Sequence, residues 1–277
     1  MIKKIVFVLS IVVLVAFTTG SDNEKKVKIL LVGDSTTIGG MPREVNPEGP
    51  HLEQMIEQLA IIEGLPAMEV VNAGKGGETA KRLLGSKHYN EKIKPVENVD
   101  YIFLRMGIND WFKCKDLKKE FPIQMKALIA QLKKDHPKAV VYLCTITSFM
   151  KPEECKQVND LINEIGKKEQ LKVLDIFTPY NQYLIENGRN SLNVRQCYLN
   201  DIPKKYHQWL KPYTYYRKGW GNKPSGNVIK VNDMSLDPIF GNIVKQWYYD
   251  RHPNSTGYNL IANETVKFLA EELSIQN

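Results

Sequence analysis

The stretch Val27-Lys-Ile-Leu-Leu-Val-Gly-Asp-Ser35 decides the fold of this chain. Its first six residues are almost wholly apolar, which is typical of a strand buried on both faces of a parallel sheet. Gly33 ends the apolar run, and Asp34 and Ser35 follow it in a turn. In an open α/β sheet, ligands bind just past the carboxyl ends of the strands. Ser35 is therefore predicted to lie exposed at the edge of such a sheet.

Short apolar runs alternate with longer amphipathic ones along most of the remaining chain. They predict further strands at residues 69–72, 101–106, 139–145 and 171–176, and helices at 51–63, 79–84, 121–134, 151–168 and 255–273. This alternation indicates parallel β-α-β units, and so an α/β fold with a mainly parallel five-stranded sheet in one domain over residues 26–277. The candidate core residues of the last helix are Leu260, Ile261, Val266, Phe268 and Leu269.

Residues from about 178 to 247 break the alternation. They are rich in Tyr, Trp, Asn, Pro and Gly and show no steady period. Connections between helices and strands in α/β folds usually run to a few residues. We therefore expect an insertion with local structure of its own.

The first twenty residues predict export. Lys3 and Lys4 precede an almost wholly apolar run at residues 5–17, and the small residues Thr18 and Gly20 precede Ser21. This pattern is typical of a secretory signal peptide over residues 1–20, and its apolar run is too short for a spanning helix. Ser21 stands where a lipoprotein would carry its lipidated cysteine. Two alternatives follow: a soluble mature protein in the periplasm, at the cell surface or in the medium, or a natural cysteine replaced by Ser21.

The formal charge is +7, and it falls to +5 when Lys3 and Lys4 leave with the signal peptide. The remaining basic residues are scattered among acids, whereas nucleic-acid binders concentrate them on one surface. No nucleic-acid partner is expected, and a preference for anionic ligands stays open.

The cysteines are Cys114, Cys144, Cys155 and Cys197. They lack the spacing of a zinc site, so no metal is expected, while export is compatible with one or two disulfides. Cys144 lies in an apolar run and is interpreted as a small buried hydrophobic residue.

Four polar or glycine-rich clusters follow predicted strands or precede the last helix. They lie at residues 33–37, 72–79, 107–110 and 250–254. The first supplies a serine, the second supplies glycines that let the backbone approach a ligand, and the third supplies the side-chain amide of Asn109. The fourth supplies His252, whose imidazole can act as a general base. Alone, each cluster is a weak signal: Gly33-Asp34-Ser35 is better explained as a turn with a helix cap, the second and third as a loop and caps, and His252 as an ordinary surface or core histidine.

Together and in this order, the clusters resemble the motif blocks of the SGNH hydrolases, also called the GDSL esterase family. The matching residues are Gly33-Asp34-Ser35, Asn72-x-Gly74-x-x-Gly77-x-Thr79, Asp100 through Gly107-x-Asn109-Asp110, and His252-Pro253-Asn254. The resemblance implies a flavodoxin-like three-layer α/β/α fold and ester hydrolysis without a metal or another cofactor. It also implies that Ser35 is the nucleophile and His252 the base. The implied oxyanion hole consists of the Ser35 N–H, the Gly74 N–H and the Asn109 side chain.

One position departs from the family pattern. The family's acid usually lies three residues before the histidine, where this chain has Tyr249. The nearest acid is Asp250, and side chains two residues apart tend to diverge in regular backbone. We assign Asp250 as the triad acid on the premise of an irregular turn. The alternatives are a backbone carbonyl, or an acid of the insertion such as Asp233 or Asp237.

The residues from the insertion to His252 are unusually aromatic. The set comprises Tyr198, Tyr206, Trp209, Tyr213, Tyr215, Tyr216, Trp220, Trp247, Tyr248 and Tyr249. Such rings suit stacking on sugars, although they could equally pack the insertion itself. We expect an exported esterase that removes O-acetyl groups from carbohydrates, with an acetylated glycan or small ester as substrate. The alternatives are a thioesterase or lysophospholipase-like esterase with an apolar groove near Ser35, and a decayed hydrolase that only binds carbohydrate.

Overall fold

The computed structural model describes residues 26–149, 151–189, 191–219, 224–231, 236–240 and 252–276. The predicted signal peptide and Ser21 lie outside these ranges, as does Asp250. Within them, no helix combines the length and the apolar character needed to cross a membrane.

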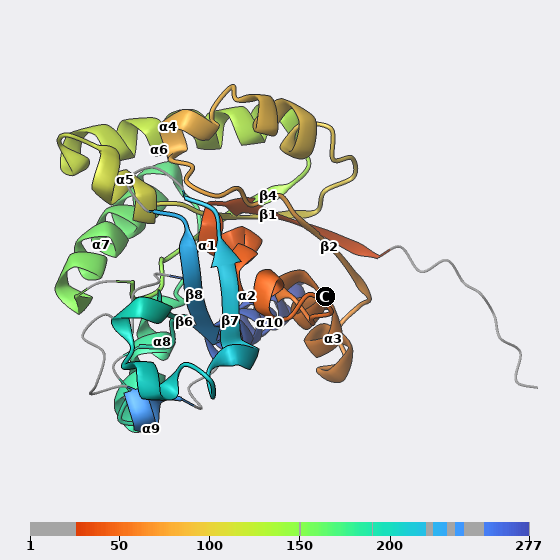
Figure 1. The fold of residues 1–277 in the computed structure, drawn as a ribbon. Helices are drawn as coiled ribbons and strands as arrows, with labels where there is room; N and C mark the ends of the chain where they lie inside the picture. Colours follow the sequence, from red (N-terminus) through yellow and green to blue (C-terminus); the bar gives the residue numbers. More distant parts are fainter. Residues whose placement is uncertain are drawn as a thin grey trace, which may run out of the picture.

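A parallel sheet of five strands forms the centre of the fold (Figure 1). Its strands are β1 (Val27–Gly33), β2 (Met68–Asn72), β3 (Tyr101–Arg105), β4 (Val140–Cys144) and β5 (Val173–Leu174), in the spatial order β2-β1-β3-β4-β5. Every neighbouring pair is parallel, so the predicted sheet is confirmed. β5 is shorter than predicted because only Val173 and Leu174 of this edge strand find partners on β4.

Helices cover both faces of the sheet, which confirms the predicted three-layer α/β/α fold (Figure 1). One face carries α4 (Ala80–Leu83), α6 (Leu117–Asp135) and α7 (Pro152–Glu169). The other carries α3 (Leu52–Ile62) and α10 (Ser255–Gln276). Because side chains of a strand point alternately to opposite faces, Leu30 and Val32 of β1 pack in the first layer, and Ile29 and Leu31 in the second.

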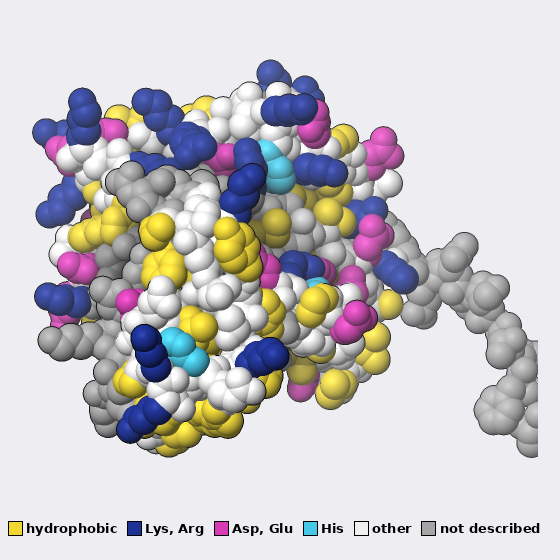
Figure 2. Space-filling model, viewed as in Figure 1, with side chains coloured by type: hydrophobic (Ala, Val, Ile, Leu, Met, Phe, Trp, Pro, Cys, Tyr) yellow, Lys and Arg dark blue, Asp and Glu magenta, His cyan; other side chains and the backbone are white. Residues whose placement is uncertain are grey.

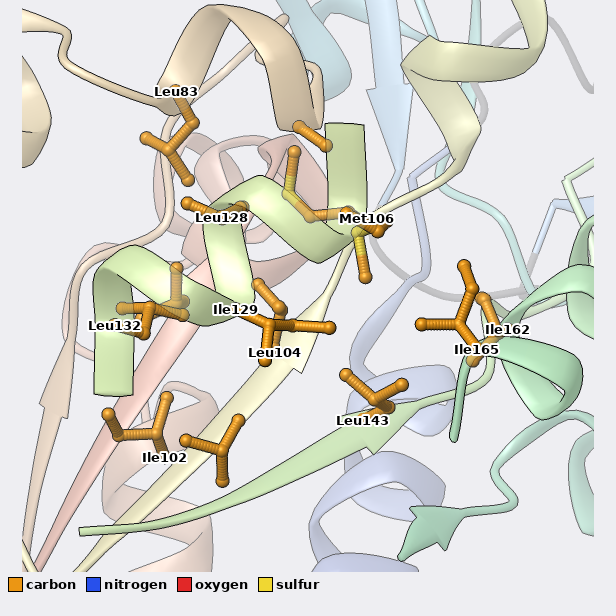
Figure 3. Close-up of a cluster of buried hydrophobic side chains, with 14 of the residues drawn as sticks. Leu83, Ile102, Leu104, Met106, Leu128, Ile129, Leu132, Leu143, Ile162 and Ile165 are labelled. Carbon is orange, nitrogen blue, oxygen red and sulfur yellow. The ribbon is translucent and has the colours of Figure 1, made fainter. Parts of the chain in front are cut away.

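Figure 3 shows the core of the first layer, in which branched aliphatic side chains of the strands face those of the helices. Residues of β3 and its end meet α6, and a residue of β4 meets α7. The contacting side chains are Ile102, Leu104 and Met106 against Leu128, Ile129 and Leu132, and Leu143 against Ile162 and Ile165. All are at most 3% exposed, and each such burial contributes roughly 1.5–3 kcal/mol to folding.

The second layer is held by aromatic rings. The ring of Tyr142 lies 5.3 Å from that of Phe103 and 4.9 Å from that of Phe268 on α10. Its hydroxyl donates to Glu272 Oε2 at 2.9 Å. Of the core residues predicted for α10, Ile261, Val266 and Leu269 are buried and Phe268 is half-buried here, while the half-buried Leu260 packs against the cluster of α8.

The region from about residue 178 has local structure of its own, as expected. It begins with a helix that the pattern does not predict, α8 (Phe177–Glu186), which packs against α10. Pro179 is tolerated because the first N–H groups of a helix have no partner within it. A three-stranded antiparallel sheet follows, made of β6 (Arg195–Tyr198), β8 (Gly226–Val231) and β7 (Thr214–Arg217) in that order, and α9 (Asp237–Phe240) comes last. This sheet has a small apolar core that includes Cys197, Leu210 and Ile229.

Candidate active site

Ser35 is the first residue of α1 (Ser35–Ile38), a helix of one turn that begins directly after β1. Asp34 caps this helix, since its Oδ1 accepts hydrogen bonds from the N–H and the hydroxyl of Thr36, both at 2.8 Å. Gly39 ends the helix in the left-handed conformation, and α2 (Gly40–Val45) follows. Ser35 is half-buried, and it lies at the amino end of a short helix that is capped at both ends.

Gly33 allows α1 to fold back tightly on the sheet. A Cβ at Gly33 would lie 2.0 Å from Thr37 Oγ1 and 2.6 Å from the carbonyl oxygen of Arg105. Neither contact is compatible with a side chain, so only glycine fits between β3 and the helix that carries Ser35.

Two buried side chains hold α1 in place by donating to the same backbone carbonyl oxygen, that of Thr36. Arg105 Nη2 donates to the carbonyl oxygen of Thr36 at 2.7 Å, and the Tyr258 hydroxyl donates to the same oxygen at 2.8 Å. Thr36, Arg105 and Tyr258 are at most 5% exposed. Because an isolated turn of helix is unstable in water, these bonds from β3 and α10 fix the position of Ser35.

The last carbonyls of α1 are held by a second set of side chains. Asn72 Nδ2 donates to the carbonyl oxygen of Thr37 at 2.9 Å and to Glu53 Oε2 at 3.0 Å. Glu53 also pairs with Arg43, whose Nε donates to the carbonyl oxygen of Ile38 at 2.8 Å. Burial raises the pKa of Glu53, but the hydrogen bonds from Arg43 and Asn72 outweigh it and leave this pKa below its ordinary value.

The loop at residues 72–79 runs beside Ser35. A Cβ at Gly74 would lie 2.4 Å from the backbone nitrogen of Ile38, so the loop touches α1 at a position that only glycine can occupy. A Cβ at Gly76 would lie 4.0 Å from Ser35 Cβ. The Gly74 N–H donates to Asn72 Oδ1 at 3.1 Å. The structure therefore brings the second cluster next to the first.

The third cluster opens α5 (Ile108–Lys113) and joins the same loop. Gly107, at φ 136°, precedes this helix. Asn109 Nδ2 donates to the carbonyl oxygen of Glu78 at 2.9 Å, which leaves the second amide hydrogen for another acceptor. Asp110 is fully buried and accepts from the Ala80 N–H at 2.9 Å. Burial, and the nearby charge of Asp34, raise the pKa of Asp110 to about 6.

His252 precedes α10 and is held by the segment before β6. The Val194 N–H donates to the carbonyl oxygen of His252 at 2.8 Å, and the Asn254 N–H donates to the carbonyl oxygen of Leu192 at 2.7 Å. The buried Asn254 caps α10 by accepting from the Gly257 N–H at 3.0 Å. The insertion therefore positions the histidine segment through backbone bonds.

The charge of His252 acts on the carboxyl of Asp34, the residue before Ser35. Burial raises the pKa of the Asp34 carboxyl, while hydrogen bonds from Thr36 and the charges of Arg105 and His252 oppose that rise. Of the acids considered for the triad, Asp250 and Asp233 lie outside the described residues, and Asp237 begins α9.

Two residues of this site are missing from the sequence-based prediction, Arg105 and Tyr258. Arg105 does leave a signal, because it is the one charged residue in the apolar run at 101–106 and a charge buried in a strand needs partners. Tyr258 leaves none, since an aromatic residue in an amphipathic helix is ordinarily a core residue.

The described residues contain no group of three His, Cys, Asp or Glu side chains arranged to hold a metal ion. Cys144 is buried as expected, and burial raises its pKa to about 12, so it stays a neutral thiol. Ser35, the glycine loop at 72–79 and Asn109 thus lie in one network at an edge of the sheet of a three-layer α/β/α fold.

A profile of the GDSL-like lipase/acylhydrolase family matches residues 31–195, and the chain belongs to this family. A search of the curated proteins finds no match. Among solved structures, the chain is similar to a lipase/acylhydrolase from Enterococcus faecalis, with a TM-score of 0.56 and 18% identity over 89% of this chain and 96% of that one. It is similar to Axe2, an acetylxylan esterase from Geobacillus stearothermophilus, with a TM-score of 0.51 and 17% identity over 88% and 95%. It is also similar to LAE5, an α/β hydrolase from the metagenome of Lake Arreo, with a TM-score of 0.52 and 16% identity over 87% and 94%.

Proposed function

We propose that this chain is an exported serine esterase that removes O-acetyl groups from carbohydrates, with Ser35 as nucleophile and His252 as base. The observation that carries the proposal is the position of Ser35. It starts a one-turn helix fixed at Thr36 by two buried donors, beside the glycine loop and near the histidine segment.

In the first step, His252 takes the Ser35 hydroxyl proton while Oγ bonds to the carbonyl carbon of the ester. The carbonyl oxygen becomes an oxyanion, which accepts hydrogen bonds from the Ser35 N–H, the Gly74 N–H and the second amide hydrogen of Asn109. The Gly74 N–H then shares its bond to Asn72 Oδ1 with the oxyanion. Each such preorganised donor contributes about 3–4 kcal/mol of transition-state stabilisation.

In the second step, the carbon–oxygen bond to the sugar breaks and His252 gives its proton to the leaving sugar hydroxyl. The acetyl group is left bonded to Ser35 Oγ as an ester. Water then gives a proton to His252 and its oxygen bonds to the acetyl carbon. Release of acetate returns the proton to Ser35 Oγ, so the enzyme ends as it began.

We assign the orientation of the His252 ring to Asp250, with a backbone carbonyl, Asp233 and Asp237 as the alternatives. An acid behind the histidine holds the tautomer that accepts the serine proton and stabilises the imidazolium that forms.

The cavity beside α1 is small. A cavity of mixed polarity lies at the carboxyl end of α1, between α2, α3 and α10. Its wall includes Ile38, Leu52 and Met55 as well as Asn46, His51 and Ser255. It encloses ≈ 10 Å³, room for about one water molecule. An acyl chain does not fit in this cavity, and Ser35 does not line it.

Four aromatic residues in the described part of the insertion differ in their exposure. Tyr206 and Tyr213 pack against the insertion's own core. Trp209 is 46% exposed and Tyr216, on β7, is 73% exposed. Figure 2 shows apolar side chains at the surface over β7 and β8, on the face that carries α1. Exposed rings there support carbohydrate as the substrate, and the similar Axe2 is described as an acetylxylan esterase.

The test is acetate release from a panel of acetylated polysaccharides, together with 4-nitrophenyl esters of increasing acyl length. We expect acetate release, fastest turnover with the acetyl ester, and loss of both in Ser35→Ala. A maximum at butyrate or a longer chain would rule out an acetylesterase. Turnover of nitrophenyl esters without release from any glycan would remove the carbohydrate assignment only.

Export is tested separately by the mass of the protein recovered from a host that secretes it. A chain that starts at residue 21 supports the signal peptide, and one that retains residues 1–20 opposes it. A Ser21→Cys variant that gains lipid supports the lipoprotein alternative.

A further inference from the structure

The rim formed by the loop at 72–79, α4 and α5 turns its cations outward and its acids inward. Residues 72–83 and 107–113 contain four cations, Lys75, Lys81, Arg82 and Lys113, and two acids, Glu78 and Asp110. Glu78 and Asp110 are 2% and 0% exposed, whereas the Arg82 side chain is 57% exposed and Lys81 and Lys113 are also exposed. The surface that a ligand meets here is positive.

Two of these cations are fixed by a neutral group. Arg82 Nη1 and Lys113 Nζ both donate to the carbonyl oxygen of Gly77, at 3.2 and 3.0 Å. A carbonyl holds the two groups together without cancelling their charge. Arg82 also lies 3.8 Å from Glu78, and Glu78 pairs with Lys75 at 2.7 Å, so one buried carboxylate faces two of the four cations.

The rim lies within reach of a substrate bound at Ser35. A Cβ at Gly76 would lie 4.0 Å from Ser35 Cβ, and Gly77 is the next residue. With standard backbone dimensions, this places Arg82 Nη1 and Lys113 Nζ within about 15 Å of Ser35 Cβ. Figure 2 shows Lys and Arg side chains gathered over α4 and α5, beside the hollow in front of α1.

We infer that the preferred substrate is an acetylated sugar that itself carries a carboxylate, which Arg82 and Lys113 attract while the acetyl group lies at Ser35. This inference rests on the proposed esterase function and adds a substrate class to it. Guanidinium and ammonium groups are the usual partners of carboxylates. At separations of about 10 Å the attraction is worth about a three- to tenfold preference, and salt screens it.

The test compares acetylated glucuronate with acetylated glucose, which differ only in the carboxylate at C6. At low salt we expect kcat/KM to be about three- to tenfold higher for acetylated glucuronate than for acetylated glucose. This ratio of the two kcat/KM values should approach one in about 1 M salt. The double variant Arg82→Gln/Lys113→Gln should bring the ratio close to one even at low salt. The double variant Lys126→Gln/Lys133→Gln, which also removes two charges but at exposed residues of α6, should leave the ratio unchanged.

A ratio near one in the wild type, or a ratio that ignores both salt and the double variant, would overturn the inference while leaving the esterase intact. If the wild type cleaves neither sugar ester nor 4-nitrophenyl acetate, the proposed function fails. Calorimetric binding to the Ser35→Ala variant then decides the inference alone: tighter binding of the glucuronate ester supports it, and equal binding of the two sugars refutes it.

Discussion

The carbonyl oxygen of Thr36 receives two buried hydrogen bonds, and this permits a quantitative test of how Ser35 is held. Tyr258→Phe removes the bond at 2.8 Å and Arg105→Met the bond at 2.7 Å. In either single variant the oxygen keeps one donor, so the part of the cost due to that bond is about 0.5–1.5 kcal/mol. In the double variant a buried carbonyl has lost both donors, and an unsatisfied buried group costs about 1–3 kcal/mol.

The free energies of unfolding should therefore be non-additive. We expect the double variant to be less stable than the sum of the single effects by about 1–2 kcal/mol. Urea denaturation of the wild type and the three variants measures this coupling. Arg105→Met also removes the interaction of Arg105 with Asp34, but it does so with Tyr258 and with Phe at position 258 alike, so this loss cancels from the coupling energy. If the two single effects on the free energy of unfolding add to within about 0.5 kcal/mol, Arg105 and Tyr258 do not act jointly on the Thr36 carbonyl oxygen.

Three further outcomes are expected. Gly74→Ala places a Cβ 2.4 Å from the backbone of α1 and should lower kcat at least about a hundredfold in an esterase assay, whereas Gly40→Ala, with open space around it, should keep near-normal activity. Burial raises the pKa of Asp110 from 3.8 to about 6. Ionisation of this carboxyl therefore costs the folded chain stability that grows as the pH rises from about 4 to 6, and below about pH 4 the carboxyl is protonated and carries no such cost. As the pH rises from about 4 to above 6, Asp110→Asn should therefore gain about 3 kcal/mol of stability relative to the wild type in urea unfolding, and a constant difference would contradict this. Asp250→Ala should lower kcat about a thousandfold or more, and near-full activity would transfer its role to a backbone carbonyl, Asp233 or Asp237.

The sheet is predictable because its signal is local. Each buried strand is a short apolar run, and each candidate residue stands at the end of such a run or before the last helix. Ser35, Gly74 and Asn109 could therefore be placed at one sheet edge, where the structure has them within one network around α1 and the loop at 72–79.

The structure of the insertion and the hydrogen bonds of Arg105 and Tyr258 to Thr36 could not be predicted in the same way. β6, β7 and β8 pair with one another in the order β6-β8-β7, which the sequence order does not reveal. Arg105 and Tyr258 meet at Thr36 across more than 150 positions of sequence, and neither has a motif that marks the contact. Such contacts depend on tertiary packing, about which local sequence patterns carry no information.

The most direct test of the account is to find the residue that carries the nucleophile. Treatment with an organophosphonate fluoride, which bonds irreversibly to activated serines, followed by mass mapping of the peptides, identifies it. We expect a single adduct on Ser35, no adduct in Ser35→Ala, and loss of esterase activity in proportion to labelling. Labelling of another residue, or full activity in Ser35→Ala, would contradict the assignment of Ser35.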